Sequence, residues 1–361
     1  MMLLHILPTG DPVHRYSKCI VVPFTGKRTV LSTCPLNGGY QENLTAVFNN
    51  DGNPGAGMAS VLRAPTYEEH MALIAKEIGL DPEKTSAMST AASMENVAIE
   101  TESFDEVIVT AVVTGGIEVN GGRVGDPASW QEVQGKAQPI KQGTINIMLF
   151  FNINLTPGAL ARSLVTCTEA KTAAIQELLA PSRYSMGLAT GSGTDGTIVV
   201  CNAESDICLT NAGKHSKFGE LIGKCVKRAV KSALNKQSGL CPAHQHQVLK
   251  RVDRFGITEQ SLWEAYAQEE HSLSRADFAE EMYQISTNGE MVTAVSLYAH
   301  LLDQLMWDMI SPKEAHDMAT KLMGIMKKEH LTPAETPENR DATLRLMIEE
   351  LKECLNSFIS R

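Results

Sequence analysis

The sequence predicts an α+β fold followed by a C-terminal all-helical domain, and three observations support this. Between about residues 18 and 235, short runs rich in β-branched residues alternate with glycine-rich turns and a few amphipathic helices. Residues 258–358 instead have helical periodicity and almost no strand signal. A length of 361 residues lies beyond the size at which single cores stop growing, so a large and a smaller domain are expected.

The elements of the first part follow one another in a readable order. Residues 18–35 read as a β-hairpin, with Thr25-Gly26 as the turn between two apolar arms. A helix over 65–80 stops at Gly79, and a buried strand over 106–116 ends in two glycines. The later elements are an apolar strand at 141–154, a long helix at 156–179, a strand at 196–202 and a basic helix at 213–237.

The boundary between the two parts is expected near residue 239. Gly239 and Pro242 interrupt the helical pattern there, and the strand signal ends. We therefore expect one domain over residues 1–238 and a helical domain of unknown role over 239–361.

Residues 258–358 read as four or five helices. Two positions match an N-cap that is followed three residues later by an acid, Ser274 with Asp277 and Ser311 with Glu314. One of these helices carries apolar residues with helical spacing on one face: Ala315, Met318, Leu322 and Ile325.

Charge and cysteine usage exclude several classes of function. Residues 1–255 hold 23 basic and 23 acidic side chains, whereas residues 256–361 hold 9 and 19. The acidic tail argues against nucleic-acid binding, which needs clustered Lys and Arg. No apolar run reaches the length that spans a bilayer, and the N-terminal residues lack the pattern of a signal peptide. The eight cysteines form no CxxC pair, so we expect reduced thiols and a cytoplasmic location.

The apolar strand at 141–154 has a polar start. Residues i and i+2 of a strand share a face, so Thr144, Asn146 and Met148 point the same way. One face of the strand therefore has a polar end. These two polar side chains either cap the strand or belong to a functional site, and the segment alone does not separate the alternatives.

The stretch "GSGTDG", residues 191–196, matches the letters of the dinucleotide fingerprint but not its context. That fingerprint requires a helix after the glycines, and here a strand follows. We interpret the stretch as a turn that lets the backbone approach another group closely, with Thr194 and Asp195 at its tip.

A weaker signal lies in "CPAHQH", where Cys241, His244 and His246 have spacing that metal sites use. The alternative is a solvated connector, because no second ligand cluster matches this one.

Two β-rich runs, 28–40 and 112–128, end in paired glycines beside polar residues. Glycine pairs allow backbone N–H groups to face a ligand without an intervening Cβ. Each run alone is equally typical of a hairpin turn, but several such loops in one domain favour a site. The candidate residues are Asn37, Gly38, Gly39, Gly115, Gly116, Asn120, Arg123 and Asp126.

Five motifs together resemble the adenosylcobinamide amidohydrolase family over residues 18–235. They are "VLSTCPLNGG", "VTGGIEVNGGRVGDPA", "GTINIMLFFNINLTPGALARSLVTCTEAKTAAIQEL", "LATGSGTDGTIVV" and "AGKHSKFGELIGKCVKRAV". The resemblance implies hydrolysis of the amide that joins the aminopropanol arm to the corrin ring of adenosylcobinamide, which releases adenosylcobyric acid for cobalamin salvage. The corrinoid is then a substrate and no cofactor is expected. In the second motif Gly115 and Gly121 replace two alanines that are usual in the family.

A more distant similarity concerns the strand at 141–154 and the helix after it. "GTINIMLFFNINLTPGALARSL" with the later "GLATG" is similar to the self-cleaving L-aminopeptidase/D-amidase and ornithine acetyltransferase families. In those families a hydroxyl residue at the strand start is the nucleophile. By position that residue is Thr144, and the fold implied is a layered αββα sandwich.

Amide hydrolysis needs a nucleophile, a base and donors for the oxyanion. If the chain is cleaved between Gly143 and Thr144, the free α-amine of Thr144 can act as the base. We expect Asn120 to be an oxyanion donor and Asn146 to orient the nucleophile. The remaining candidates are expected to bind the substrate: Asn37, Gly38, Gly39, Gly115, Gly116, Arg123, Asp126, Thr194, Asp195 and His215.

Two other functions stay open at this point. The chain is alternatively an inactive corrinoid-binding or regulatory protein, or a hydrolase whose water is activated by a metal held by His215 or residues 241–246. Metal dependence, self-cleavage and assembly into a homo-oligomer are likewise open.

Overall fold

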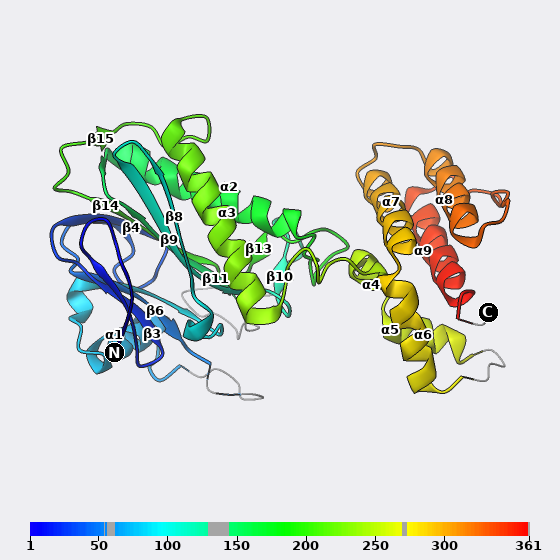
Figure 1. Cartoon of the computed structure of the whole chain (residues 1–361), viewed down its shortest axis with the longest axis horizontal. Coiled ribbons are helices and arrows are strands. Elements are labelled where there is room, and N and C mark those ends of the chain that lie inside the picture. The colour runs from blue at the N-terminus through cyan, green and yellow to red at the C-terminus, as the bar shows by residue number, and fades with distance from the viewer. Residues whose placement is uncertain (54, 56–61, 129–143, 269–272, 360–361) are drawn as a thin grey trace. The chain divides into compact units, whose positions relative to one another are not determined.

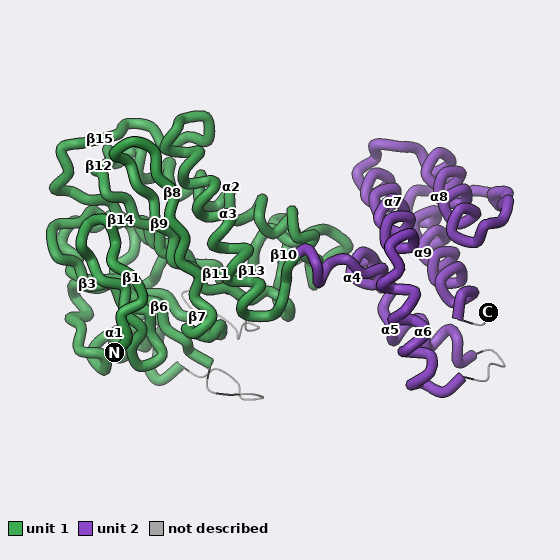
Figure 2. Tube along the Cα trace, in the orientation of Figure 1, with its two compact units in different colours: residues 1–241 green, residues 242–361 purple. Residues whose placement is uncertain are grey.

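The computed structural model describes residues 1–361 except 54, 56–61, 129–143, 269–272 and 360–361. The chain divides into two compact units, Met1–Cys241 and Pro242–Arg361 (Figures 1 and 2). Both units enclose buried apolar side chains of their own. The predicted cleavage position after Gly143 lies outside the described residues.

A five-stranded sheet forms one part of the first unit, with the strand order β1-β2-β3-β6-β7. Its strands are β1 (Met2–Ile6), β2 (Pro12–Tyr16), β3 (Cys19–Pro23), β6 (Ala46–Asp51) and β7 (Thr85–Thr90). β6 and β7 pair in parallel, and the other neighbours are antiparallel.

A six-stranded sheet has the order β5-β4-β14-β11-β9-β8. Its strands are β4 (Arg28–Ser32), β5 (Gly39–Gln41), β8 (Ala98–Phe104), β9 (Val107–Gly116), β11 (Thr144–Phe151) and β14 (Gly196–Asn202). β11 and β14 are parallel, whereas the other neighbours are antiparallel. Two short pairs complete the described strands: β10 (Gly121–Gly122) with β13 (Gly191–Ser192), and β12 (Asn154–Leu155) with β15 (Cys208–Leu209).

Apolar side chains arrange these elements in layers. Val22 and Val47 of one sheet and Met148 of the other belong to one core between the sheets. Helix α1 (Tyr67–Glu77) packs on the outer face of the five-stranded sheet. Helices α2 (Pro157–Glu177) and α3 (Lys217–Ser238) pack on the outer face of the other sheet (Figure 1). The order is that of a layered αββα sandwich, and the predicted α+β class is confirmed.

The first two long helices begin at residues that the sequence marks as caps. Thr66 forms a capping box with Glu69 at the start of α1, and Thr156 caps α2 ahead of Pro157. Both caps satisfy backbone N–H groups that have no partner within the helix. Short 3₁₀ helices cover Pro82–Lys84 (η1) and Met94–Asn96 (η2).

The predicted hairpin at residues 18–35 is wrong. β3 lies in the five-stranded sheet and β4 in the six-stranded sheet, so the connection between them crosses from one sheet to the other. Asp11 holds this connection, because its carboxylate accepts hydrogen bonds from Thr25 N at 2.7 Å and from Arg28 Nε at 2.8 Å. A local apolar pattern cannot predict this partner, which lies in the turn between β1 and β2.

The second unit is helical over its described residues, as predicted. Its elements are α4 (Val248–Val252), η3 (Asp253–Phe255), α5 (Glu259–Tyr266), α6 (Arg275–Thr287), α7 (Gly289–Met306), α8 (Pro312–Lys327) and α9 (Arg340–Asn356). The predicted caps Ser274 and Ser311 are confirmed, since each side chain accepts a backbone N–H three residues later.

One detail of α8 differs from the expectation. Ala315 is buried, but Met318 and Ile325 of the predicted stripe are 44% and 68% exposed. The buried face instead includes His316 and Met323. His316 can turn inward because Thr336 Oγ1 and the Glu350 carboxylate lie at 2.8 and 3.1 Å from its ring nitrogens.

Two further features concern the helices and the cysteines. Among the described helices, none is long and apolar enough to cross a membrane. All eight cysteines are free thiols.

Candidate functional site

The candidate site lies at one edge of the six-stranded sheet, where several strand ends meet. β11 begins at Thr144, and its register partner on β9 is Gly116, the last residue of that strand. β14 begins at Gly196, which pairs with Asn146. The face prediction for β11 is confirmed, because Met148 and Phe150 lie between the sheets while Ile145 and Ile147 face the helices.

Three successive contacts join the start of β11 to residues 194–196. The hydroxyl of Thr144 donates to the carbonyl oxygen of Thr194 at 2.6 Å. The backbone N–H of Ile145 donates to Asp195 Oδ1 at 2.9 Å. The N–H of Gly196 donates to Asn146 Oδ1 at 3.2 Å. Residues 194–196 therefore hold Thr144 in place, both through its hydroxyl and through the N–H of the next residue.

Asp195 is the charged centre of this loop. Its carboxylate accepts from Ser192 Oγ at 2.7 Å and from Ser192 N at 3.1 Å, and it forms an ion pair with Lys171 of α2. The side chains of Lys171 and Asp195 are each only 11% exposed.

Gly191 explains why the stretch "GSGTDG" needs its first glycine. A Cβ at this position would lie 2.8 Å from Lys171 Nζ and closer still to the Asp195 carboxylate. The backbone thus passes directly over the ion pair, which is the close approach that the sequence predicted.

Asn146 links the two sheets through a buried polar network. Its amide donates to Asn49 Oδ1 at 2.8 Å and to the Ser89 carbonyl at 3.0 Å. Asn49 in turn donates to Thr114 Oγ1 at 2.7 Å. Because Asn49, Thr114 and Asn146 are at most 2% exposed, their partners are needed to offset the cost of burying amides and hydroxyls.

Asn120 lies beside the same loop. It is 2% exposed and directly precedes β10, whose Gly121 pairs with Ser192.

Gly115, another predicted binding residue, is the register partner of Ile145. A Cβ on Gly115 would meet Ile145 Cγ1 at 3.3 Å, and one on Gly116 would meet Gln237 Cγ at 3.2 Å. The two glycines therefore allow the end of α3 to pack against β9.

Arg123 and Asp126 form a turn after β10. The backbone N–H of Arg123 donates to Asp126 Oδ2 at 2.8 Å, and the Arg123 side chain donates to the Leu188 carbonyl at 3.4 Å. Burial by itself would raise the pKa of Asp126, but hydrogen bonds from Ser182 and Ser185 outweigh it and lower that pKa. Asp126 is thus held as a carboxylate next to the β10–β13 pair.

Asn37, Gly38 and Gly39 follow β4 at the same edge of the sheet. Asn37 has a positive φ of 45°, and its amide donates to the carbonyls of Pro82 and Thr85 at 2.6 and 2.8 Å. Gly39 has a φ of 74°, which favours glycine. These contacts give Asn37 a structural task in joining the loop to β7.

His215 is not brought to this edge. It is exposed and directly precedes the N-cap of α3, whose Phe218 packs on Phe151 with ring centroids 4.8 Å apart. Phe151 ends β11 and Thr144 begins it, so about 23 Å of strand separates the two ends.

Several residues of this network were not predicted from the sequence. Lys171 had a readable signal, since it interrupts a buried helical face formed by Cys167, Ala170 and Ala174. Asn49 had no clear signal, because it is one of three consecutive polar residues that end β6. Ser89 and Ser192 had no such signal. Ser89 takes part through its backbone carbonyl, and Ser192 lies in a short glycine-rich stretch.

The arrangement limits how Thr144 can react. Among the described residues, the recorded partners of Thr144 Oγ1 are the Thr194 carbonyl and, at 3.4 Å, Asn146 Oδ1. A carbonyl or amide oxygen is too weak a base to deprotonate a hydroxyl. A free α-amine on Thr144 would be a base strong enough for this step.

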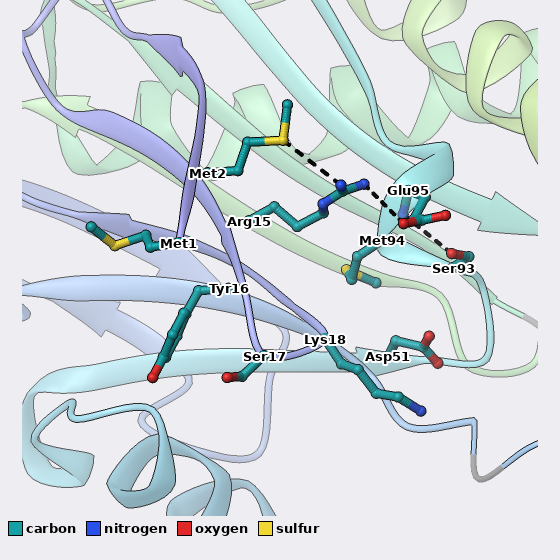
Figure 3. Close-up of a pocket in the computed structure, with 10 residues that line it drawn as sticks. All are labelled: Met1, Met2, Arg15, Tyr16, Ser17, Lys18, Asp51, Ser93, Met94 and Glu95. Carbon is teal, nitrogen blue, oxygen red and sulfur yellow. Dashed lines mark hydrogen bonds and ion pairs between the residues drawn. The ribbon is translucent and has the colours of Figure 1, made fainter.

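A cavity of about 630 Å³ lies apart from the predicted site residues (Figure 3). Arg15 and Glu95 form an ion pair of 3.5 Å at its wall, and Lys18 donates to the Asn53 carbonyl. Its lining residues are Met1, Met2, Arg15, Tyr16, Ser17, Lys18, Asp51, Ser93, Met94 and Glu95.

The described residues contain no group of three or more His, Cys, Asp or Glu side chains that is placed to hold a metal ion.

Comparison with known proteins decides the family. The family model described as adenosylcobinamide amidohydrolase matches residues 5–242. The chain belongs to the adenosylcobinamide amidohydrolase family. The resemblance inferred from the five motifs is thereby confirmed, and residues 243–361 lie outside the family match.

Two relatives and one solved structure are similar to this chain. The uncharacterized protein MJ1613 of Methanocaldococcus jannaschii is 37% identical over 238 residues, which cover 63% of this chain and 89% of the relative. The adenosylcobinamide amidohydrolase of Methanosarcina mazei is 27% identical over 207 residues, or 55% of this chain and 86% of that protein. The crystal structure of the PH0078 protein from Pyrococcus horikoshii OT3 aligns over 69% of this chain and 88% of that one, with a TM-score of 0.32 and 11% identity. This TM-score is too low to bear on the fold.

Proposed function

We propose that this chain hydrolyses the amide bond between the aminopropanol arm and the corrin ring of adenosylcobinamide, with Thr144 as nucleophile. One observation carries the proposal: in a chain of this family, a buried strand begins with a hydroxyl that a charged loop holds in place. The products are adenosylcobyric acid and aminopropanol, and the reaction belongs to corrinoid salvage in the cytoplasm.

The proposed chemistry has two steps. Thr144 Oγ attacks the amide carbonyl, the C–N bond breaks, and aminopropanol leaves with the proton that the base removed from the hydroxyl. Water then hydrolyses the ester and restores Thr144. Asn120 is proposed to donate to the oxyanion, and Asn146 to orient the start of β11.

A product assay separates this proposal from its alternatives. The purified full-length protein, incubated with adenosylcobinamide, is expected to release adenosylcobyric acid and aminopropanol in equal amounts. Binding of the corrinoid without product would favour the inactive binding protein. Loss of activity with a chelator, restored by a divalent ion, would favour metal-activated water instead.

Intact mass spectrometry tests the source of the base. A break between Gly143 and Thr144 is expected, which frees the α-amine of Thr144. If the active protein has the mass of the uncleaved chain, another group must remove the hydroxyl proton.

A further inference from the structure

Lys171 is a charge on a helix face that otherwise packs in the core. Its neighbours on that face of α2, Cys167 and Ala174, are fully buried, and the Lys171 side chain is 11% exposed. The partner recorded for its ammonium is the carboxylate of Asp195. A lysine in such surroundings costs free energy of desolvation, which the ion pair offsets.

The carboxylate that Lys171 neutralises lies one peptide away from Thr144. Asp195 Oδ1 accepts the N–H of Ile145, so the Lys171–Asp195 pair is joined directly to the start of β11. Gly191 keeps the pair in place, because a side chain there would displace both charges.

The ammonium of Lys171 and the carboxylate of Asp195 have opposite effects on an α-amine that cleavage would free on Thr144. A nearby ammonium disfavours the protonated form of an amine, whereas a nearby carboxylate favours it. In this low-exposure setting the two effects are weakly screened by water. If cleavage frees the α-amine of Thr144, the two effects on this amine oppose each other.

We propose that Lys171 is an electrostatic positioning residue of the Thr144 site, whose ammonium balances Asp195 and so sets the pH range in which Thr144 is active. This inference rests on the proposed function. Among the described residues, further titratable groups beside this site are Cys167, whose pKa burial raises to about 12, and Glu118, whose side chain lies near Gly116. Neither side chain is a cation that could balance the Asp195 carboxylate.

The test is the pH dependence of kcat/KM in matched variants. Lys171→Met leaves the Asp195 carboxylate without its counter-ion. The acidic limb of the profile, on which kcat/KM rises with pH, is therefore expected to shift to higher pH by about one unit or more. Asp195→Asn leaves Lys171 unbalanced, and the limb is expected to move down by a similar amount. The double variant neutralises both, and its limb is expected to return close to that of the wild type.

Two controls distinguish charge from shape. Lys171→Arg keeps the charge and is expected to keep the wild-type limb. Lys227→Met breaks a surface pair with Glu177, at the end of the same helix, and is expected to leave the profile unchanged. Circular dichroism reports whether each variant folds.

Several results would overturn the inference while leaving hydrolysis by Thr144 intact. One such result is that the acidic limbs of the two single variants move in the same direction or do not move. Another is that Lys171→Arg folds but is inactive. If Lys171→Met does not fold, Asp195→Asn decides, since an unmoved or raised limb contradicts the proposal. An inactive wild-type protein would instead refute the proposed function itself.

Discussion

Thr144 depends on residues that lie far from it in the sequence. Its hydroxyl contacts Thr194, and its strand neighbour Asn146 contacts Asn49, which is 97 residues away. Breaking one of these buried hydrogen bonds by removing a single partner costs about 1–3 kcal/mol, because the other polar group is left unsatisfied. The geometry around Thr144 is therefore over-determined by several contacts, as the proposed role of nucleophile requires.

At this scale we predict that Asn120→Ala lowers kcat on adenosylcobinamide by about 10²- to 10³-fold. The reason is that an oxyanion donor interacts with the transition state more strongly than with the substrate. Steady-state kinetics measure the effect, and KM is expected to stay within a few-fold of the wild type. A rise confined to KM would make Asn120 a substrate-binding residue.

Strand periodicity predicted the faces of Thr144 and Asn146, because the alternation of a strand is a local property. It could not predict the partners of these residues, since Asn49 and Ser89 belong to the other sheet. The sequence marks Lys171 only as a charge on an apolar helix face, and it could not predict the partner Asp195, since residues 191–196 meet α2 only in the folded chain.

At the scale of elements, the loop between β13 and β14 joins α2 to β11. Gly191 lies in β13 and Gly193 in the loop that follows it, but a Cβ at 191 would clash with the ion pair whereas a Cβ at 193 has nothing within 4 Å. The two glycines therefore form a matched pair for testing the role of the loop.

We predict that Gly191→Ala destabilises the protein by about 1–3 kcal/mol, as overpacking typically does, and lowers activity at least tenfold. Displacement of Lys171 and Asp195 is the physical reason. Thermal unfolding and the product assay measure the two effects, with Gly193→Ala as the control that stays near wild type. Equal behaviour of the two variants would argue that the ion pair can move without consequence.

Local patterns also failed for one element. The arms of the expected hairpin at 18–35 are both apolar, so nothing in them distinguishes pairing with each other from pairing in two sheets. The buried contacts of Asp11 with Thr25 and Arg28 decide this outcome. Helix caps were predicted correctly because a cap is formed by residues three positions apart.

At the scale of the whole molecule, the family match and the residues of the candidate site lie in the first unit. The family model ends at residue 242, and the first unit ends at Cys241. The second unit carries an excess of acidic side chains and encloses buried residues such as Tyr298 and Met347, whose contact includes a hydrogen bond of 2.7 Å from the tyrosine hydroxyl. Nothing in its sequence pattern indicates a role beyond that of a helical domain.

We predict that a fragment of residues 1–241 is folded and hydrolyses adenosylcobinamide within a few-fold of the full chain. Each sheet and each helix of the αββα sandwich lies within this fragment, so its cores are complete. Size-exclusion chromatography and the product assay measure the outcome. Aggregation, or inactivity with a native-like circular dichroism spectrum, would show that the helical unit belongs to the working enzyme.

The central claim concerns one hydroxyl, and comparing Thr144→Ala with Thr144→Ser tests it most directly. Thr144→Ala removes the hydroxyl from a buried strand end, whereas Thr144→Ser keeps it and removes a methyl group. The measured quantity is the rate of adenosylcobyric acid release by each variant, after circular dichroism has shown that both are folded. We predict no detectable turnover for alanine and measurable turnover for serine, and alanine activity within a few-fold of the wild type would contradict the assignment of Thr144 as the nucleophile.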